Sequence, residues 1–146
     1  MNRALTVTAG VIAAAMVAAC GSETTAPGVS AAGSYVATQF ITTGSSGQTN
    51  QLLAGSTVNL VLAENGTTSG HLHLVASPGT AAMDVDLAGT WTQHGMSVDL
   101  SLAADTFVED LPFTLTPRAA DGWDLVADAV FAGTRVQLTL TQGGSI

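Results

Sequence analysis

The sequence predicts an all-β domain over residues 34–146, folded as an eight-stranded antiparallel up-and-down β-barrel. Three observations favour this fold class. Apolar and polar residues alternate in short runs from Ser34 onward, which is the period of a strand with one buried face. Turns that contain glycine separate these runs at short spacing, as in antiparallel hairpins. No window carries the apolar stripe of an amphipathic helix. A two-sheet sandwich built from the same hairpins is the alternative.

Two segments near the start of this domain do not fit the strand pattern. Gly44-Ser45-Ser46-Gly47 has the composition of a flexible loop, and Gln51-Leu52-Leu53-Ala54 is compatible with a helical turn. The remaining runs predict strands over residues 34–43, 56–63, 67–76, 84–93, 96–104, 111–117, 123–131 and 134–142.

Two hairpins have turns of two residues, His94-Gly95 and Ala132-Gly133. Such turns set which side chains share a face, because a shift of one residue inverts a strand. Both turns place the large apolar residues on one side. The predicted pairs are Gln93–Met96, Trp91–Val98, Gly89–Leu100 and Leu87–Leu102, and then Phe131–Thr134, Ala129–Val136, Ala127–Leu138 and Leu125–Leu140.

The turn at Glu64-Asn65-Gly66 allows two registers. A two-residue Asn-Gly turn would place His71 and His73 beside Leu60 and Val58. A three-residue turn with Gly66 in the left-handed region keeps the leucines together, so we predict this second register. Its pairs are Leu62–Thr68, Leu60–Gly70 and Val58–Leu72.

The first 19 residues have the order of a secretory signal peptide, with Arg3 followed by an apolar run. The run is shorter than the ~20 apolar residues of a spanning helix, and no basic cluster follows it. A cleaved signal is therefore expected rather than an uncleaved anchor. Residues 20–33 are small and polar around Pro27, which predicts a flexible linker.

Val17-Ala18-Ala19-Cys20 resembles the lipobox of bacterial lipoproteins. The resemblance implies that Cys20 becomes the lipidated first residue of the mature chain and anchors it to the cell envelope. In a cell with two membranes, Gly21 after the cysteine implies the outer membrane.

Three stretches of the domain carry a second resemblance. They are Ala-Gly-Ser-Tyr at 32–35, Leu-x-Leu-x-x-Asn-Gly-Thr at 60–67, and Gly-Thr-Trp-Thr-x-x-Gly-x-x-Val-x-Leu at 89–100. Together they look like lipocalin-like bacterial lipoproteins, which are small eight-stranded barrels, and the similarity covers roughly residues 33–142. Gly33-Ser34-Tyr35 departs from the Gly-x-Trp that opens true lipocalins, and their helix and cysteine pairs are missing.

The chain carries eleven acidic residues against three basic ones, a formal net charge of −8. It has no lysine, and Arg3 leaves with the signal peptide. A negative field repels phosphate backbones, so we expect no nucleic-acid partner. Cys20 is the only cysteine, so no disulfide stabilises the domain, and a monomer is expected.

No enzyme, cofactor or metal site is predicted. The chain has neither a Gly-x-Ser-x-Gly elbow nor a glycine-rich phosphate loop with a lysine. His71 and His73 point the same way, but strand pairing is expected to place Thr90 and Ala88 opposite them, with Asp86 only diagonal to His73. Two exposed histidines are therefore favoured over a metal site. The acidic pairs 84/86 and 109/110 lack the spacing of a calcium loop.

An eight-stranded barrel is just wide enough either to fill itself or to hold one small ligand. Small residues on the inward face, on strands 67–76, 84–93 and 123–131, predict an apolar pocket for a small hydrophobic ligand. The alternative is a solid barrel that acts as a structural or protein-interaction module. Its partner is unknown, and the 105–112 connection either displays Phe107 to that partner or tucks the ring into the barrel mouth. The candidate ligand-binding residues are Tyr35, Thr68, Gly70, Gly89, Trp91, Trp123, Ala127 and Ala129.

Overall fold

The computed structural model describes residues 29–78, 80–119 and 121–143. The predicted signal peptide and Cys20 lie outside these ranges. Within them every regular element is a β-strand, and no helix there is long and apolar enough to cross a membrane. The strands are β1 (Gly33–Gly44), β2 (Gly47–Asn50), β3 (Thr57–Leu62), β4 (Thr67–Leu74), β5 (Met83–Asp86), β6 (Gly89–His94), β7 (Ser97–Leu102), β8 (Phe113–Pro117), β9 (Trp123–Phe131) and β10 (Thr134–Gln142).

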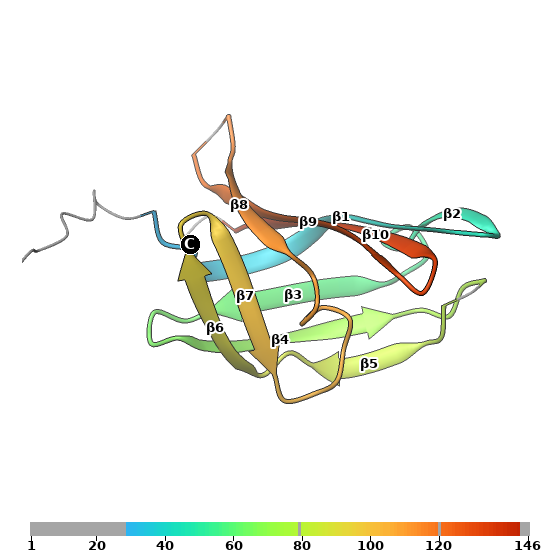
Figure 1. The fold of residues 1–146 in the computed structure, drawn as a ribbon, viewed down its shortest axis with the longest axis horizontal. Coiled ribbons are helices and arrows are strands. Elements are labelled where there is room, and N and C mark those ends of the chain that lie inside the picture. The colour runs from blue at the N-terminus through green and yellow to red at the C-terminus, as the bar shows by residue number, and fades with distance from the viewer. Residues whose placement is uncertain (1–28, 79, 120, 144–146) are drawn as a thin grey trace, which may run out of the picture.

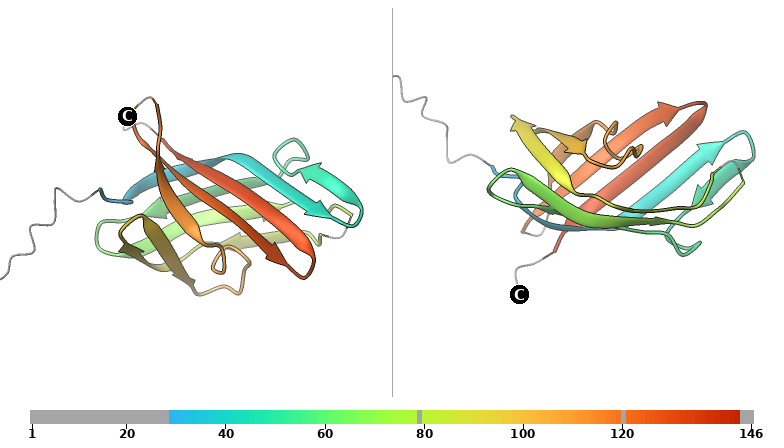
Figure 2. Two further views of the ribbon diagram at one scale, coloured as in Figure 1. Left: turned by 45° about the horizontal axis from the view of Figure 1, so that its top comes forward. Right: turned by 90° about the horizontal axis from the view of Figure 1, so that it is seen from below.

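Eight of these strands close into an antiparallel barrel in the order β1-β3-β4-β6-β7-β8-β9-β10 (Figures 1 and 2). Closure is made by β1 and β10, which pair from Tyr35–Gln142 to Thr43–Arg135. The predicted barrel is therefore confirmed, and the sandwich alternative, in which these two strands would not pair, is wrong.

Two further strands lie beside the barrel wall. The Gly44–Gly47 segment is a tight turn rather than a loose loop, and it joins β1 to β2. The predicted strand 84–93 is two strands, β5 and β6, separated at Leu87 and Ala88. Both pair with β4 in one register, and the Leu87 backbone N–H between them donates to the Gly70 carbonyl at 3.0 Å. In this register β5 pairs with the second half of β4, and β6 with its first two residues.

Two of the three predicted hairpin registers are confirmed. The three-residue turn at Gly66 gives the predicted β3–β4 pairs, and the turn at Ala132-Gly133 gives the predicted β9–β10 pairs. Ala132 and Gly133 have φ of 47° and 82°, as a type I′ hairpin turn requires.

The β6–β7 register is wrong by two residues. His94 pairs with Ser97 and Trp91 with Leu100, so the turn is Gly95-Met96 rather than His94-Gly95. Gly95 has φ of 62° and takes the first turn position, where a positive φ fits a type II′ hairpin. A shift of two residues keeps every side chain on its face, so the predicted inward set of this hairpin is unchanged.

The chain enters at one end of the barrel, here called the closed end, and covers it. Ala31 is fully buried, and its N–H donates to the Gln93 side chain at 2.8 Å. The Tyr35 hydroxyl donates to the Ala31 carbonyl at 2.6 Å, and the Gln93 amide donates to the Val29 carbonyl at 2.7 Å. The packed part of the chain thus begins before the residue 34 boundary expected from the sequence.

The opposite end, here called the mouth, is partly filled by the connection between β7 and β8. Val108 and Leu111 of this connection are buried, and Phe107 packs against the core at its edge. Thr106 is buried as well, and its hydroxyl has no hydrogen-bond partner. The connection therefore folds inward and does not display its apolar side chains.

Candidate functional site: a cavity at the barrel mouth

A cavity of about 300 Å³ opens at the mouth. Its wall comes from β1, β4, β5, β9 and β10 and from the β4–β5, β7–β8 and β9–β10 connections. Phe40 and Phe107 lie together there, with ring centroids 6.0 Å apart and ring planes tilted by 32°. The lining residues are Phe40, Thr42, Leu74, Thr80, Ala81, Met83, Phe107, Phe131, Ala132, Thr134 and Val136.

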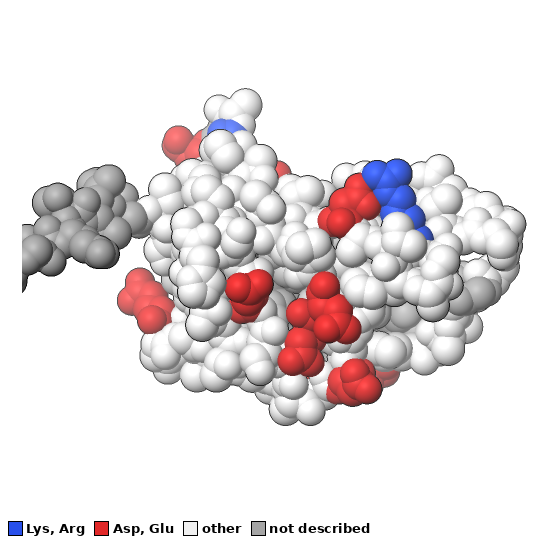
Figure 3. Space-filling view, viewed as in Figure 1, with Lys and Arg blue, Asp and Glu red and all other residues white. Residues whose placement is uncertain are grey.

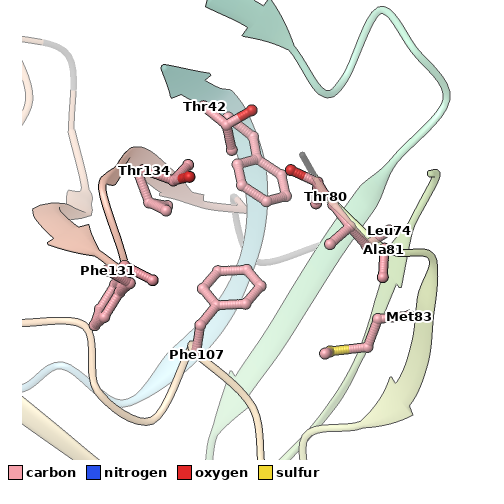
Figure 4. Close-up of a pocket in the computed structure, with 11 residues that line it drawn as sticks. Thr42, Leu74, Thr80, Ala81, Met83, Phe107, Phe131 and Thr134 are labelled. Carbon is pink, nitrogen blue, oxygen red and sulfur yellow. The ribbon is translucent and has the colours of Figure 1, made fainter. Parts of the chain in front are cut away.

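The cavity has an apolar side and a hydroxyl-bearing side. Figure 4 shows Thr42, Thr80 and Thr134 grouped on one side, and Phe107, Phe131 and Met83 on the other. Within the described ranges, no charged side chain lines this cavity. Such a wall suits an apolar molecule with a single polar group, because hydroxyls can orient an oxygen without demanding a charge.

A buried amide holds the hydroxyl-bearing side in place. Gln51 is fully buried, and its Nε2 donates to Thr42 Oγ1 at 2.8 Å and to Ser77 Oγ at 3.2 Å. Its Oε1 accepts from Ser56 Oγ at 3.2 Å. This one side chain therefore ties β1, the turn after β2 and the β4–β5 connection to each other, since buried polar groups are stable only when hydrogen-bonded.

None of the eight predicted ligand-binding residues lines this cavity. Tyr35 and Trp123 lie near the closed end, and Ala127 packs opposite Leu138 while Ala129 lies opposite Val136. Trp91 donates its indole N–H to the Ala63 carbonyl at 2.8 Å and lines a separate hollow of about 80 Å³ with Leu100.

The remaining predicted residues, Thr68, Gly70 and Gly89, belong to strand contacts. The Thr68 hydroxyl donates to the Leu87 carbonyl at 2.9 Å. A Cβ atom on Gly70 or Gly89 would lie 2.9 Å from Leu60 Cα or Leu102 Cα, respectively. These glycines mark close backbone approach and leave no free volume.

Sequence reasoning missed most of the cavity lining. It did place Leu74, Phe131 and Val136 on the inward face, and it gave Phe107 as a ring that could enter the mouth. Phe40 and Thr42 follow the irregularity between Ala37 and Gln39 in β1, which shifts the alternation of this strand. The remaining lining residues come from strand ends and connections, where alternation no longer predicts direction. Thr80 and Ala81 had no signal in the sequence at all.

A second group of polar side chains lies on the outer surface of β4 and β5. His71 pairs with Asp86 and His73 with Asp84, which corrects the expected partners Thr90 and Ala88. His71 Nδ1 lies 3.0 Å from Asp86 Oδ1, its Nε2 contacts Asp84, and His73 Nδ1 lies 3.1 Å from Asp84 Oδ2.

These contacts shift the protonation of the cluster. Hydrogen bonding to Asp86 raises the pKa of His71, and hydrogen bonding from His73 lowers the pKa of Asp84. Over the described ranges, no three His, Cys, Asp or Glu side chains are arranged to hold a metal ion. The cluster thus links β4 to β5 through ion pairs, and it is called the ion-pair clip below. Within the described residues, β5 pairs with β4 and with no other strand.

The closed barrel is compatible with a lipocalin-like fold. Comparisons of the chain with protein-family models, curated proteins and solved structures find no match. The mouth cavity and the N-terminal sequence are therefore the basis on which a function is proposed.

Proposed function

We propose that this protein is a membrane-anchored, lipocalin-like lipoprotein that binds a small hydrophobic ligand at the barrel mouth. The observation that carries the proposal is the apolar cavity of about 300 Å³ between Phe40, Phe107 and Phe131. That volume lies at the lower limit of the ~300–1,000 Å³ typical of small-molecule sites. The aromatic rings supply apolar area, and the threonine hydroxyls supply orientation.

The anchor is proposed from the lipobox sequence that ends at Cys20. The described chain begins at Val29 and enters the barrel at the closed end (Figure 2). The residues that line the cavity lie at the other end. A barrel tethered through its N-terminus therefore exposes its mouth away from the attached membrane, where a ligand can enter from the aqueous side. We propose a monomer in the cell envelope, at the outer membrane in a two-membrane cell, without enzymatic activity.

Binding is tested with a small neutral fluorescent probe, 1-naphthylamine, on the full-length protein in mild detergent, with the signal of protein-free detergent subtracted. Val136 is buried and lines the cavity, so Val136→Phe should fill it and weaken probe binding by about tenfold or more. Val130→Phe adds the same side chain in the same hairpin on the exposed face. That control variant should bind like the wild type. Equal binding by all three proteins, or by none, would rule out the cavity as the site.

The anchor needs its own test. Cys20→Ala should abolish partitioning into the detergent phase, and inhibition of the lipoprotein signal peptidase should cause the precursor to accumulate. An alanine variant that still partitions with detergent would show that the attachment does not run through Cys20.

A second candidate function is a structural or protein-interaction module. It is favoured by the packed interior away from the mouth, where Tyr35, Leu60 and Leu125 are fully buried. Crosslinking in intact cells separates the two functions. A single specific partner, together with no probe binding, would favour the interaction module.

A further inference from the structure

We infer that the ligand of the mouth cavity is a small uncharged molecule, an alcohol, ester or ketone on an apolar skeleton, and that carboxylates such as fatty acids are rejected. The inference rests on the proposed function, since it concerns the same cavity. At about 30 Å³ for a water-sized group, a cavity of about 300 Å³ holds roughly ten non-hydrogen atoms, and a ligand can extend somewhat further through the open mouth. The ligand is thus of the size of a ten-carbon alcohol.

The polar groups of the cavity match a neutral oxygen. They are hydroxyls, on Thr42, Thr80 and Thr134. The oxygen of Thr42 already accepts a hydrogen bond from Gln51, which leaves its O–H as a donor. A hydroxyl or carbonyl oxygen of a ligand needs one or two such donors. A carboxylate in an apolar cavity needs a cation or several N–H groups, and its transfer from water otherwise costs several kcal/mol.

Among the residues that the structure describes, no cationic side chain lines the cavity to supply that compensation. The chain has no lysine, and the described ranges contain two arginines. Arg135 follows the lining residue Thr134, but its side chain lies on the opposite face of β10, where Nε donates to Asp128 Oδ1 at 2.8 Å. Arg118 precedes β9 near the closed end and donates to the Gln142 carbonyl at 3.2 Å.

The surroundings of the mouth are acidic. Asp84 is next to Met83 in the chain, and Asp105 and Glu109 flank Phe107 on the β7–β8 connection. Acidic groups outnumber basic ones on the face in Figure 3. An anion approaching the mouth therefore meets repulsion as well as desolvation, whereas a neutral molecule of the same skeleton meets neither.

The test compares ligands that share one skeleton. Decanol, methyl decanoate, decanoate and decyltrimethylammonium, each below its micellar concentration, compete with 1-naphthylamine for the full-length protein at neutral pH. The alcohol and the ester should displace the probe at concentrations at least about tenfold lower than decanoate. A moderate rise in salt should leave the alcohol unaffected, because no charge is involved.

A gain-of-function variant tests the rejection of carboxylates in a second way, because a gain in binding cannot result from loss of folding. Thr80→Arg places a guanidinium on the cavity wall and should bring decanoate to at least the affinity of decanol. Thr116→Arg makes the same change of charge on exposed β8, distant from the cavity. This second variant should keep the wild-type preference.

Each outcome bears on one claim. Decanoate binding as well as decanol, or decyltrimethylammonium binding best, overturns the inference about charge while ligand binding stands. Probe binding that depends on Val136 but responds to none of the four competitors overturns the inferred size and class. Probe binding unaffected by Val136→Phe removes the proposed function itself.

Discussion

Gly89 lies where β6 crosses β7 at close range, and replacing it with alanine should destabilise the barrel strongly. Gly89 pairs with Leu102 on β7 and with Thr68 on β4. A Cβ atom at this position would lie 2.9 Å from Leu102 Cα and nearer still to the Ser101 carbonyl oxygen. Both are backbone atoms, which have no rotamer to change. The two strands would therefore have to separate.

The size of the effect follows from this clash. Overpacking at a site with backbone neighbours typically costs about 1–3 kcal/mol, and each ladder hydrogen bond that is lost adds about 1 kcal/mol. Gly89→Ala should thus lower the free energy of unfolding by about 2–4 kcal/mol. With roughly 4 °C for each kcal/mol in a domain of this size, the melting temperature should fall by about 8–16 °C.

Thermal and urea unfolding measure the loss, and Gly44→Ala is the matched control. Gly44 is also in a strand, its φ lies outside the left-handed region, and its nearest contact would be Thr134 Oγ1 at 3.6 Å. The control should change stability by less than about 1 kcal/mol. If Gly89→Ala has the same melting temperature as the control variant, there is room for a Cβ atom at Gly89. The interpretation of this position as volume for a ligand would then regain support.

Three further outcomes can be measured on the same protein. Burial and the nearby charge of Asp124 raise the pKa of Tyr35 to about 12, so the single tyrosine should ionise near pH 12 in the folded protein and near pH 10 in urea. The contribution of the neutral Tyr35 to the free energy of unfolding should be complete below about pH 10 and should be lost as the pH rises through about 12. A folded-state midpoint near pH 10 would contradict the buried hydroxyl. Thr106→Val removes a buried hydroxyl without a partner and should raise the free energy of unfolding by about 1 kcal/mol, whereas a loss would mean that the hydroxyl is satisfied. Because the pKa of His71 is raised, its ion pairs stabilise the fold below about pH 6.5 and stop doing so as the pH rises through the folded value. His71→Gln should therefore lower the melting temperature more at about pH 5 than at about pH 9, and an equal drop at both pH values would refute the ion-pair clip.

The sequence was sufficient for the barrel because turn chemistry and alternation agree along most of the chain. Ala132-Gly133 admits positive φ at two positions, and Gly66 admits it at one, so each turn defines a register. His94-Gly95-Met96 offers two possible two-residue turns. His94-Gly95 has glycine at the second turn position, and Gly95-Met96 has it at the first. Alternation cannot choose between them, because the two registers differ by two residues and bury the same side chains.

The break between β5 and β6 could not be found from local pattern. Residues 84–93 alternate without interruption, which reads as one strand. At the break the Leu87 N–H still donates to the Gly70 carbonyl, at the point where Gly70 approaches β3 closely. Such a contact joins residues that are distant in the chain. The observed register differs by four residues from the expected one, and it pairs Asp86 and Asp84 with the histidines in place of Thr90 and Ala88.

The cavity was beyond sequence reasoning for a different reason. Small residues on the inward face predict free volume inside the barrel, but at Gly70 and Gly89 neighbouring backbone occupies the space that a side chain would take. Free volume is instead decided by where the connections settle. The β7–β8 connection inserts Val108 deeply and leaves Phe107 at the cavity edge. The composition of the connection does not predict which of these two side chains is buried more deeply.

The interior is thus filled at one end and hollow at the other, and energetics explain why these conditions coexist. A sealed, empty cavity costs about 24 cal/mol per Å³, so one of about 300 Å³ would cost about 7 kcal/mol. That is comparable to the whole stability of a typical domain, about 5–15 kcal/mol. Packing Tyr35 and the leucines at the closed end avoids this cost where the barrel is covered. At the mouth the cavity stays open, so water or a ligand occupies it, and an apolar wall favours the ligand because displaced water returns to bulk.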